Sequence, residues 1–338
     1  MKQAERSGGG GGGVGGWRAL VQLPGGPLDL VGDVHGELEV LQSLMAHLGY
    51  GPDGDHPGGR TLVFLGDLID RGPDSPGVVR LVSGLMDRGR AVTVMGNHDL
   101  NAAAGIPKAD NTWLFGHGPI HESECGVSSE RERSELLGFL NTLPIAARRD
   151  DLRVVHACWE DAGLDMLRGA AGPAAALSEH KARIASALPA EVDQTTRNLA
   201  HQNQNPVKLL TSGPEEIAPT PFFAGGKVRG EARSAWWDRF DSDPIVVFGH
   251  YWRIPIEVLQ KDDGLFSKHP LDATLGKGKA MCIDYSVGGR AAERRAGNRH
   301  GPFLGRLAAL RWPERELVFD NGERLPMTGP ISSTGDLV

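Results

Sequence analysis

The stretch from Leu28 to Gly36 reads LDLVGDVHG, and the expected fold follows from it. Its first four residues are mostly apolar, which favours a short buried strand. A glycine and then Asp33 and His35 follow at once. Aspartate and histidine are residue types that bind metals, and ligands of α/β proteins bind beyond the carboxyl ends of strands. The stretch therefore predicts a buried strand whose end carries polar chemistry.

The same pattern, an apolar run that ends at a polar or ionisable residue, recurs along the chain. It appears at residues 62–67, 92–97, 154–156 and 245–250, which read LVFLGD, VTVMGN, VVH and IVVFGH. Apolar residues at helical spacing occupy 38–48 and 78–86 between the first three runs, which indicates βαβ alternation and a parallel or mixed sheet. Further strands are expected at 280–283 and in a hairpin over 307–319. The predicted class is α/β.

The composition excludes several other classes of protein. The 338 residues include 47 Gly and 22 Pro, but they show no Gly-X-Y period, which excludes collagen. A hydrophobic share of 40% and a charged share of 23% are globular values, which exclude wholesale disorder. No run approaches the ~18 consecutive apolar residues of a membrane span. The length is ample for a sizeable core.

Charge and cysteine usage bear on partners and location. The net charge is −7 and the pI about 6.0, which argues against a nucleic-acid-binding surface but allows a small anionic substrate. Three scattered cysteines argue against a disulfide framework, and the N-terminal residues lack the apolar segment of a secretory signal. We therefore expect a cytoplasmic protein with no membrane partner.

The chain is expected to hold one domain. Residues 1–16 are glycine-rich and predict a disordered tail. Residues 17–325 are expected to form the domain, with a cap-like insertion around 161–240, where periodicity is poor apart from an Ala-rich helix near 174–187. Residues 326–338 are expected to be a C-terminal tail. What the 161–240 region covers stays open.

The polar residues after the runs form a candidate metal site. The set contains aspartate, asparagine and histidine but no cysteine, which favours manganese, iron or zinc over a soft metal. Six such residues exceed the ligands that one catalytic metal takes while keeping an open position, and two metals that share a carboxylate would use them all. The candidates are Asp33, His35, Asp67, Asn97, His156 and His250.

Taken in order, the motifs resemble a known family. They are GDVHG at 32–36, GDLIDRG at 66–72, GNHD at 96–99, VHA at 155–157 and GH at 249–250. This order resembles the calcineurin-like metallophosphoesterase superfamily, and the DRG ending of the second motif is similar to the branch of phosphoprotein phosphatases and bacterial symmetrical diadenosine tetraphosphatases. The resemblance covers roughly residues 28–290. It implies a four-layer αββα sandwich with mixed sheets.

The resemblance also implies a role for each matched residue. Asp33 and His35 would bind one metal, Asp67 would bridge, and Asn97, His156 and His250 would bind the second metal. The ions would be two divalent metals, with manganese expected and iron or zinc as alternatives, and a hydroxide bridging them would attack phosphorus. His98 would protonate the leaving oxygen while Asp70 orients it. Arg71 and Asn97 would contact the substrate phosphate.

The sequence departs from the family pattern after His156, where Cys158 and Trp159 follow Ala157. Cys158 is interpreted as a small rim or core residue, with a redox-sensitive thiol as the alternative. A second phosphate-binding arginine is expected, and four candidates stay open: Arg229, Arg233, Arg239 and Arg253. Aromatic residues gather in the second half, and they predict either core packing or a stacking wall for a planar group. They are Trp236, Trp237, Trp252, Phe222 and Phe223. Asp284 and the following Gly-Gly pair resemble a late family segment near the active site.

The leading hypothesis is a two-metal phosphoesterase that acts on a phosphate ester or phosphoanhydride. The acidic charge and the aromatic set favour a nucleotide such as diadenosine tetraphosphate. A protein serine/threonine phosphatase, with a phosphoprotein substrate, is the alternative. A non-catalytic metal-binding scaffold is the alternative from another class, although every expected ligand and His98 are present.

Overall fold

The structure is a computed structural model. It describes residues 16–118, 120, 124–224, 227–255, 264–266 and 269–329. The predicted tails, residues 1–16 and 326–338, lie outside these ranges except for residues 16 and 326–329, and Pro326 ends a strand. The strands of the described residues form two large mixed sheets and a separate two-stranded hairpin. No described helix is long and apolar enough to cross a membrane.

The first sheet contains the motif strands from the first hundred residues. Its order is β13-β12-β11-β2-β3-β4, with β2, β3 and β4 parallel and β11 antiparallel to β2. The bounds are β2 (Leu28–Val31), β3 (Thr61–Phe64), β4 (Ala91–Thr93), β11 (Ala308–Trp312), β12 (Glu316–Phe319) and β13 (Arg324–Pro326). The hairpin expected over 307–319 is present as β11 and β12.

The second sheet contains the later motif strands. Its order is β1-β5-β6-β9-β10, with β6, β9 and β10 parallel and β5 antiparallel to β6. The bounds are β1 (Leu20–Gln22), β5 (Ala146–Arg149), β6 (Leu152–Val155), β9 (Val246–Phe248) and β10 (Ala280–Cys282). The five runs singled out in the sequence are thus divided between two sheets.

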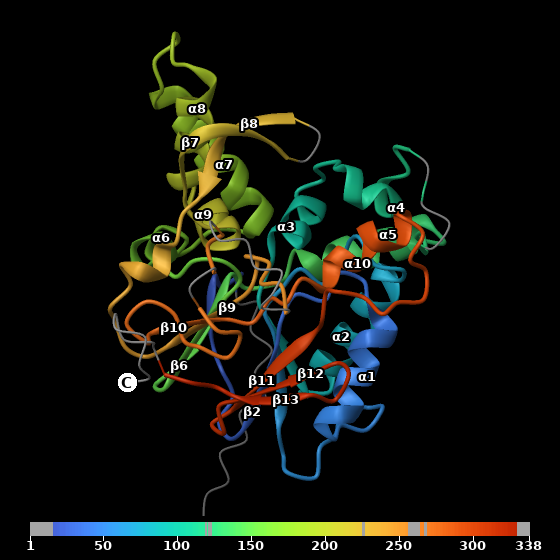
Figure 1. Ribbon diagram of the computed structural model, residues 1–338. Coiled ribbons are helices and arrows are strands. Elements are labelled where there is room, and N and C mark those ends of the chain that lie inside the picture. The colour runs from blue at the N-terminus through green and yellow to red at the C-terminus, as the bar shows by residue number, and fades with distance from the viewer. Residues whose placement is uncertain are drawn as a thin grey trace, which may run out of the picture.

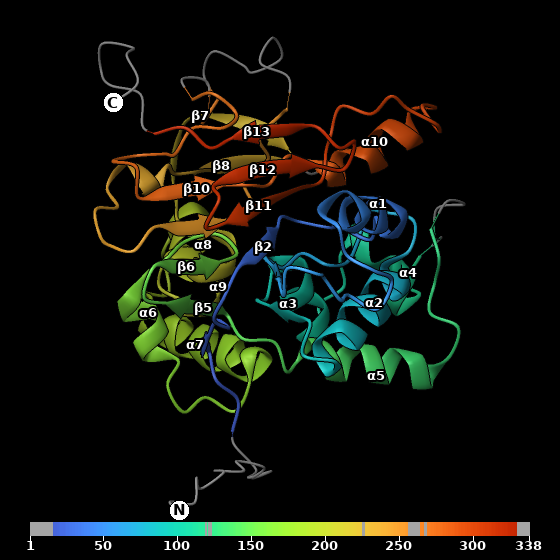
Figure 2. The same ribbon diagram turned by 90° about the horizontal axis from the view of Figure 1, so that it is seen from below.

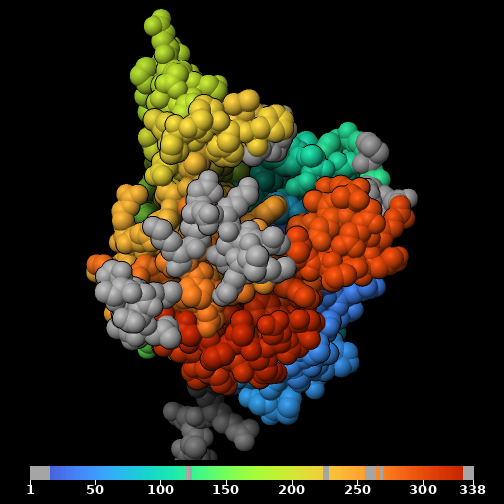
Figure 3. Space-filling model, viewed as in Figure 1, coloured from blue at the N-terminus to red at the C-terminus, as the bar shows by residue number. Residues whose placement is uncertain are grey.

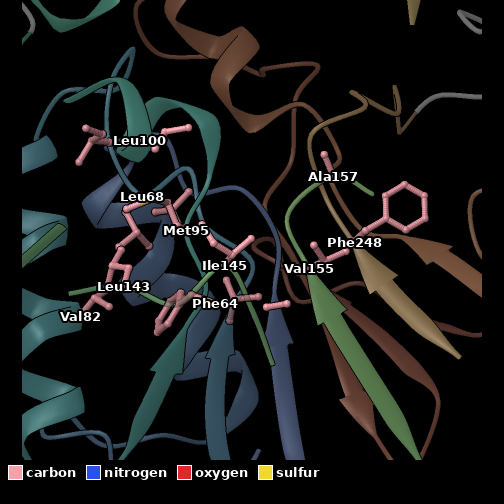
Figure 4. Close-up of a cluster of buried hydrophobic side chains, with 14 of the residues drawn as sticks. Phe64, Leu68, Val82, Met95, Leu100, Leu143, Ile145, Val155, Ala157 and Phe248 are labelled. Carbon is pink, nitrogen blue, oxygen red and sulfur yellow. The ribbon is translucent and has the colours of Figure 1, made fainter. Parts of the chain in front are cut away.

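The two sheets pack face to face. Leu30 and Val63 of the first sheet share one buried cluster with Val154 and Val247 of the second. A larger cluster covers the outer faces, where helices pack, and Figure 4 shows part of it. In Figure 2, α1 and α2 lie on the right and α6 and α7 on the left, with β2 between them. The result is the expected helix–sheet–sheet–helix arrangement with mixed sheets.

Helices α1 and α2 connect the motif strands of the first sheet. α1 buries the apolar stripe Leu41, Leu44, Met45 and Leu48, as its spacing predicts. The Asp74 side chain caps α2 at its N-terminus. The helices before β5 are α1 (Leu38–Leu48), α2 (Ser75–Asp87), α3 (Asn97–Ala103), η1 (Ala109–Asn111), α4 (Thr112–Phe115) and α5 (Glu130–Leu140).

The region around 161–240 builds helices and a hairpin beside the second sheet. Its helices are α6 (Asp161–Met166), α7 (Pro173–Ala187), α8 (Gln194–Asn203), α9 (Pro206–Ser212) and η2 (Trp236–Asp238). The hairpin pairs β7 (Glu215–Ala224) with β8 (Lys227–Arg233). Figure 1 shows it above β9, and Figure 3 shows it as a yellow band across the upper part of the molecule. Near the end of the chain, η4 (Val287–Gly289) leads into α10 (Arg290–Arg295).

Candidate metal and phosphoester site

The polar residues after five strands meet at one place, although the strands belong to two sheets. The backbone N–H of His250, which follows β9, donates to both carboxylate oxygens of Asp33, which follows β2, at 3.3 and 3.1 Å. The N–H of His98, at the start of α3, donates to Asp67 Oδ1 at 2.9 Å. These bonds join the first sheet's motifs to each other and to the second sheet.

The turns that carry the site are held in an unusual backbone conformation. Among the described residues, eight that are not glycine have positive φ; six of them lie in turns after the motif strands and a seventh, Ser286, lies after β10. They are His35, Asp67, Asp70, Arg71, His250, Trp252 and Ser286. A side chain in this region costs free energy, and such residues gather where function over-determines the backbone.

Two glycines are required by the close approach of these turns. A Cβ at Gly96 would lie 2.1 Å from the backbone nitrogen and from Oδ1 of Asp67. A Cβ at Gly249 would lie 2.0 Å from Asp33 Oδ1. The small residue before each polar residue therefore makes room for a carboxylate from another strand.

Two groups of three side chains have the geometry of metal sites. His35, Asp67 and His98 form one group, and Asp67, His156 and His250 form the other. Within each group, the possible ligand atoms lie within 4.8 Å of one another. Asp67 belongs to both groups, and its Oδ2 lies 3.6 Å from His35 Nε2 and 3.4 Å from His156 Nε2.

Unpaired buried atoms show that the site fits divalent cations. Asn97 Oδ1 and His156 Nε2 are buried and have no hydrogen-bond partner. His156 Nδ1 donates to the carbonyl of Leu65 at 2.7 Å, and this bond orients Nε2 toward Asp67. A carbonyl-type oxygen, an imidazole nitrogen and carboxylates are the donors that manganese, iron or zinc accept.

The electrostatics around Asp33 and Asp67 also favour added positive charge. Burial and the charge of Asp284 raise the pKa of Asp33 well above its usual range. Burial alone would lower the pKa of His156, but the carboxylates of Asp67 and Asp33 outweigh it and raise that pKa to about 10. Burial and the neighbouring Arg233 lower the pKa of His250, which favours the neutral imidazole that metals bind.

His98 lies in a chain of hydrogen bonds beside the two groups. Its Nδ1 donates to Asp70 Oδ2 at 2.7 Å, and Trp113 Nε1 donates to Asp70 Oδ1 at 2.7 Å. Burial alone would lower the pKa of His98, but Asp67 and Asp70 outweigh burial and raise it. The predicted pair of His98 and Asp70 is therefore in contact.

Arg71 lies between the histidines of the first group. Its Nη1 lies 3.0 Å from His35 Nε2, and its Nη2 lies 3.0 Å from His98 Nε2. Because a guanidinium donates only, both Nε2 atoms accept. The fork of Arg71 is therefore directed at two histidines of the candidate site.

The structure separates the four arginine candidates. Arg233 donates to the carbonyl oxygen of His250 at 2.9 Å, so it lies at the site. Arg253 is fully buried and donates to the backbone carbonyls of Cys282 and Pro270, which is a structural role. Arg239 is exposed at the end of η2, and Arg229 lies in the hairpin.

The five aromatic residues singled out in the sequence also divide into buried and exposed side chains. Trp236 and Trp237 are buried, and both pack on Phe248 in the core. Phe222 and Phe223 are exposed on the hairpin, whereas Trp252 is 42% exposed and covers Arg71.

Burial decides between the two interpretations of Cys158. Its side chain is buried, and burial raises the pKa of the thiol far above its usual range. An inert core residue fits this position, and a redox-sensitive thiol does not.

Two buried carboxylates have contacts that the motifs did not reveal. Asp99 accepts from the N–H of Leu68 at 3.0 Å and from that of Gly96 at 2.9 Å, which ties the second motif to the third. Asp284 accepts from the N–H of Trp252 at 2.8 Å and from that of Ser286 at 2.9 Å. The position of Asp284 after β10 was the sequence signal for its role. No feature of the local sequence distinguished Asp99 from an aspartate that only caps a helix.

Comparison with known proteins agrees with this geometry. The model of the calcineurin-like phosphoesterase family matches residues 26–251, about two thirds of the chain. The chain therefore belongs to the calcineurin-like phosphoesterase family, the class of metal-dependent phosphoesterases.

More specific relatives match only part of the chain. An asymmetrical bis(5′-nucleosyl)-tetraphosphatase of Anoxybacillus flavithermus is 45% identical over 38% of this chain and 55% of its own length. A symmetrical bis(5′-nucleosyl)-tetraphosphatase of Methylococcus capsulatus is 34% identical over 38% of this chain and 41% of its own length. The chain thus spans about half the length of these relatives.

Solved structures match more of the chain at lower similarity. A protein serine/threonine phosphatase of Saccharomyces cerevisiae is 17% identical, covers 92% of this chain and 84% of its own, and has a TM-score of 0.49. A likeness at this level adds nothing to the family assignment.

Proposed function

We propose that this chain hydrolyses a phosphate ester or phosphoanhydride, with diadenosine tetraphosphate or a related dinucleoside polyphosphate as the substrate. The observation that carries the proposal is the position of Asp67. It belongs to two groups of metal-ligand geometry, and its Oδ1 accepts the N–H of His98, the proposed acid. Two groups with the geometry of metal ligands and the backbone of the proposed acid thus meet at one carboxylate, which supports a binuclear site beside His98.

The residues present suit two divalent ions, with manganese as the expected metal and iron or zinc as alternatives. Asp33 and His35 would hold one ion, and Asp67 would be shared by both. The second ion would be held by Asn97, His156 and His250. Asn97 and His156 have buried atoms without a hydrogen-bond partner, and His156 and His250 lie near Asp67. When bound, the ions would supply an activated water nucleophile and neutralise charge on phosphate.

The protein side chains supply phosphate binding and a proton. Arg71 would bind two phosphate oxygens through its fork, and Asn97 would contact the phosphate beside it. When the phosphate takes up the guanidinium, Nε2 of His98 is free to carry a proton toward the leaving oxygen. The raised pKa of His98 and its bond to Asp70 keep that proton available.

Arg233 is our choice for the second phosphate-binding arginine. It is the candidate that contacts a proposed ligand, through the carbonyl of His250. Its charge already acts on this region, since it contributes to lowering the pKa of His250. Arg71 and Arg233 together would offset the negative charge of the phosphates.

The proposal of a nucleotide substrate rests on the relatives and on the net charge of the chain. Both relatives described above are named as bis(5′-nucleosyl)-tetraphosphatases, one asymmetrical and one symmetrical. The net charge of −7 makes binding of acidic macromolecules unfavourable away from the site. The same site chemistry would serve a protein serine/threonine phosphatase, which is the alternative function.

The test is a substrate panel with added manganese. It compares diadenosine tetraphosphate, p-nitrophenyl phosphate and phosphoserine peptides, with His98→Ala as the matched control. We expect the dinucleotide to have the highest kcat/KM and the variant to lose activity on it. A preference for phosphopeptides would favour the protein phosphatase over the nucleotide hydrolase. If the metal-bound protein were inactive on all three substrates, a non-catalytic metal-binding scaffold would be favoured.

A further inference from the structure

Trp252 is an exposed aromatic residue beside the proposed phosphate site. It lies two residues after His250, and 42% of its surface is exposed. The guanidinium carbon of Arg71 lies over the indole, 4.5 Å from the ring centroid. One face of the ring is therefore occupied by the arginine that would bind phosphate, and the proposed chemistry leaves the rest of the ring unused.

The backbone holds this ring in place. Trp252 has φ of +58°, a conformation that is unfavourable for a bulky residue and persists only where surrounding contacts enforce it. Its N–H donates to Asp284 Oδ2 at 2.8 Å, and Asp284 is buried. A large apolar surface is thus kept at the site instead of in the core.

The other tryptophans of this region show what core packing looks like here. Trp237 has no exposed surface and stacks on Phe266 with an interplanar angle of 8°. Trp236 is 7% exposed and contacts Phe240 and Phe248. Trp252 differs from both, because its described ring contact is with a charged residue of the site.

We infer that the outer face of Trp252 stacks a nucleobase whose phosphates lie on Arg71, so that the site selects nucleoside polyphosphates. This inference rests on the proposed function, and it adds that the protein recognises the nucleobase as well as the phosphates. Stacking on an aromatic face suits every base and is worth more than a surface ion pair.

The spacing favours a nucleoside over a simple aryl phosphate. A ring in van der Waals contact with the outer face would lie roughly 8 Å from the guanidinium carbon of Arg71, given a contact distance of about 3.5 Å. A ring bonded directly to the oxygen of a phosphate held by Arg71 has no spacer with which to pass around the indole to its other face. A base separated from its phosphates by a ribose has the required spacer.

The test is equilibrium binding of two non-hydrolysable diphosphates to the manganese-supplemented full chain. The probes are adenosine 5′-(α,β-methylene)diphosphate and methylenediphosphonate, which share the diphosphate and differ by the nucleoside. The readout is the ratio of their Kd values by calorimetry, so that loss of phosphate affinity cancels. The variants are Trp252→Leu, Trp252→Phe and, as a matched control, Phe223→Leu on the hairpin, where the side chain is 74% exposed.

The expected result is a preference for the nucleoside probe that falls about tenfold in Trp252→Leu and is mostly kept in Trp252→Phe and Phe223→Leu. A ratio unchanged in Trp252→Leu, or reduced equally in Trp252→Phe and Trp252→Leu, would overturn the inference. Binding is measured without turnover, so failure here leaves the hydrolysis measured in the substrate panel as a separate result.

Discussion

The two carboxylate oxygens of Asp67 have different contacts. Oδ2 faces the imidazoles of His35 and His156, while Oδ1 accepts the backbone N–H of His98. Burial alone would raise the pKa of Asp67, but the surrounding histidines outweigh burial and lower it. Asp67 is therefore held as a carboxylate between imidazoles, as a shared metal ligand needs to be.

Asp67→Asn and His98→Ala should separate metal binding from proton transfer. We expect Asp67→Asn to lower both bound metal and turnover, because a neutral amide is a poor bridging ligand. His98→Ala should retain metal and lose about 10²–10⁴-fold in kcat, the usual range for a general acid. Metal analysis and steady-state kinetics on the same preparations measure both effects.

The leaving group supplies the control for His98. A leaving group that needs little protonation, such as p-nitrophenolate, should suffer less from His98→Ala than an alkyl leaving group does. If metal-replete His98→Ala hydrolysed poor leaving groups at the wild-type rate, His98 would not be the acid.

The cysteines give a residue-scale test of burial. Cys125 is exposed, whereas Cys158 and Cys282 are buried, and burial raises the pKa of both buried thiols. We expect a thiol reagent to label Cys125 rapidly in the native protein and the other two only after unfolding. Rapid labelling of Cys158 before unfolding, mapped by peptide mass, would show that its pocket opens.

Local motifs predicted the proposed ligands because each pairs a residue type with a strand end. In the structure, Asp67 lies close to His35, His156 and His250, Asp33 accepts from the N–H of His250, and His98 contacts Asp70, while the metal and catalytic roles of these residues stay predictions. Trp113 and Asp99 could not be found in this way, because their roles depend on partners 43 and 31 residues away in sequence.

At the scale of elements, short apolar strands were predictable and irregular ones were not. The five motif runs and the hairpin of β11 and β12 match strands of the structure within one or two residues. β7 contains Pro219 and Pro221, which argue against a strand, and its pairing with β8 shifts register between Ile217 and Phe222. Helices α5 and α8 have few apolar residues, so their periodicity is weak.

The turn before α3 tests the close approach of elements. Gly96→Ala would place a Cβ 2.1 Å from Asp67, so we expect a loss of about 1–3 kcal/mol in the free energy of unfolding, together with lower metal affinity. The control is Gly138→Ala in α5, where a Cβ meets nothing within 4 Å. Alanine there should stabilise the helix by up to about 1 kcal/mol. Urea denaturation compares the two, and equal midpoints would contradict the predicted crowding.

At the scale of the whole molecule, β2 leads into the proposed metal ligand Asp33 at one end and contains a buried ionic cluster near the other. Asp29 is fully buried, and its carboxylate contacts Arg60 at 2.8 Å, Tyr50 at 2.8 Å and Arg311 at 3.2 Å. Asp33 lies four residues further on, about 13 Å along an extended chain. Stability and chemistry are therefore separable along this strand.

Asp29→Asn should destabilise the fold without altering catalysis. Removing one charge from a buried cluster leaves the others uncompensated, so we expect a loss of about 3 kcal/mol. The kcat/KM of the folded fraction should stay within about twofold of wild type. Arg168→Met, which removes an exposed ion pair with Asp165, should leave the urea midpoint unchanged. A large drop in kcat/KM of Asp29→Asn under folded conditions would contradict the separation.

The sequence predicted the class of fold but not the division of strands between sheets. The motif runs look alike, and the partner of a strand is decided by packing across the molecule. Alternation alone predicts neighbouring strands, whereas β2 pairs with β11 from the far end of the chain. The proposed ligands converge because both sheets direct the carboxyl ends of these strands to the same side.

The most direct test is a manganese titration of chelator-treated protein, with bound metal and phosphate release measured on the same samples. The site predicts that metal-free protein is folded and inactive, and that activity on diadenosine tetraphosphate returns as two ions bind per chain. Asp67→Asn should fail to recover in parallel. Full activity in metal-free protein, or no activity on any phosphate ester after two ions have bound, would contradict a binuclear phosphoesterase.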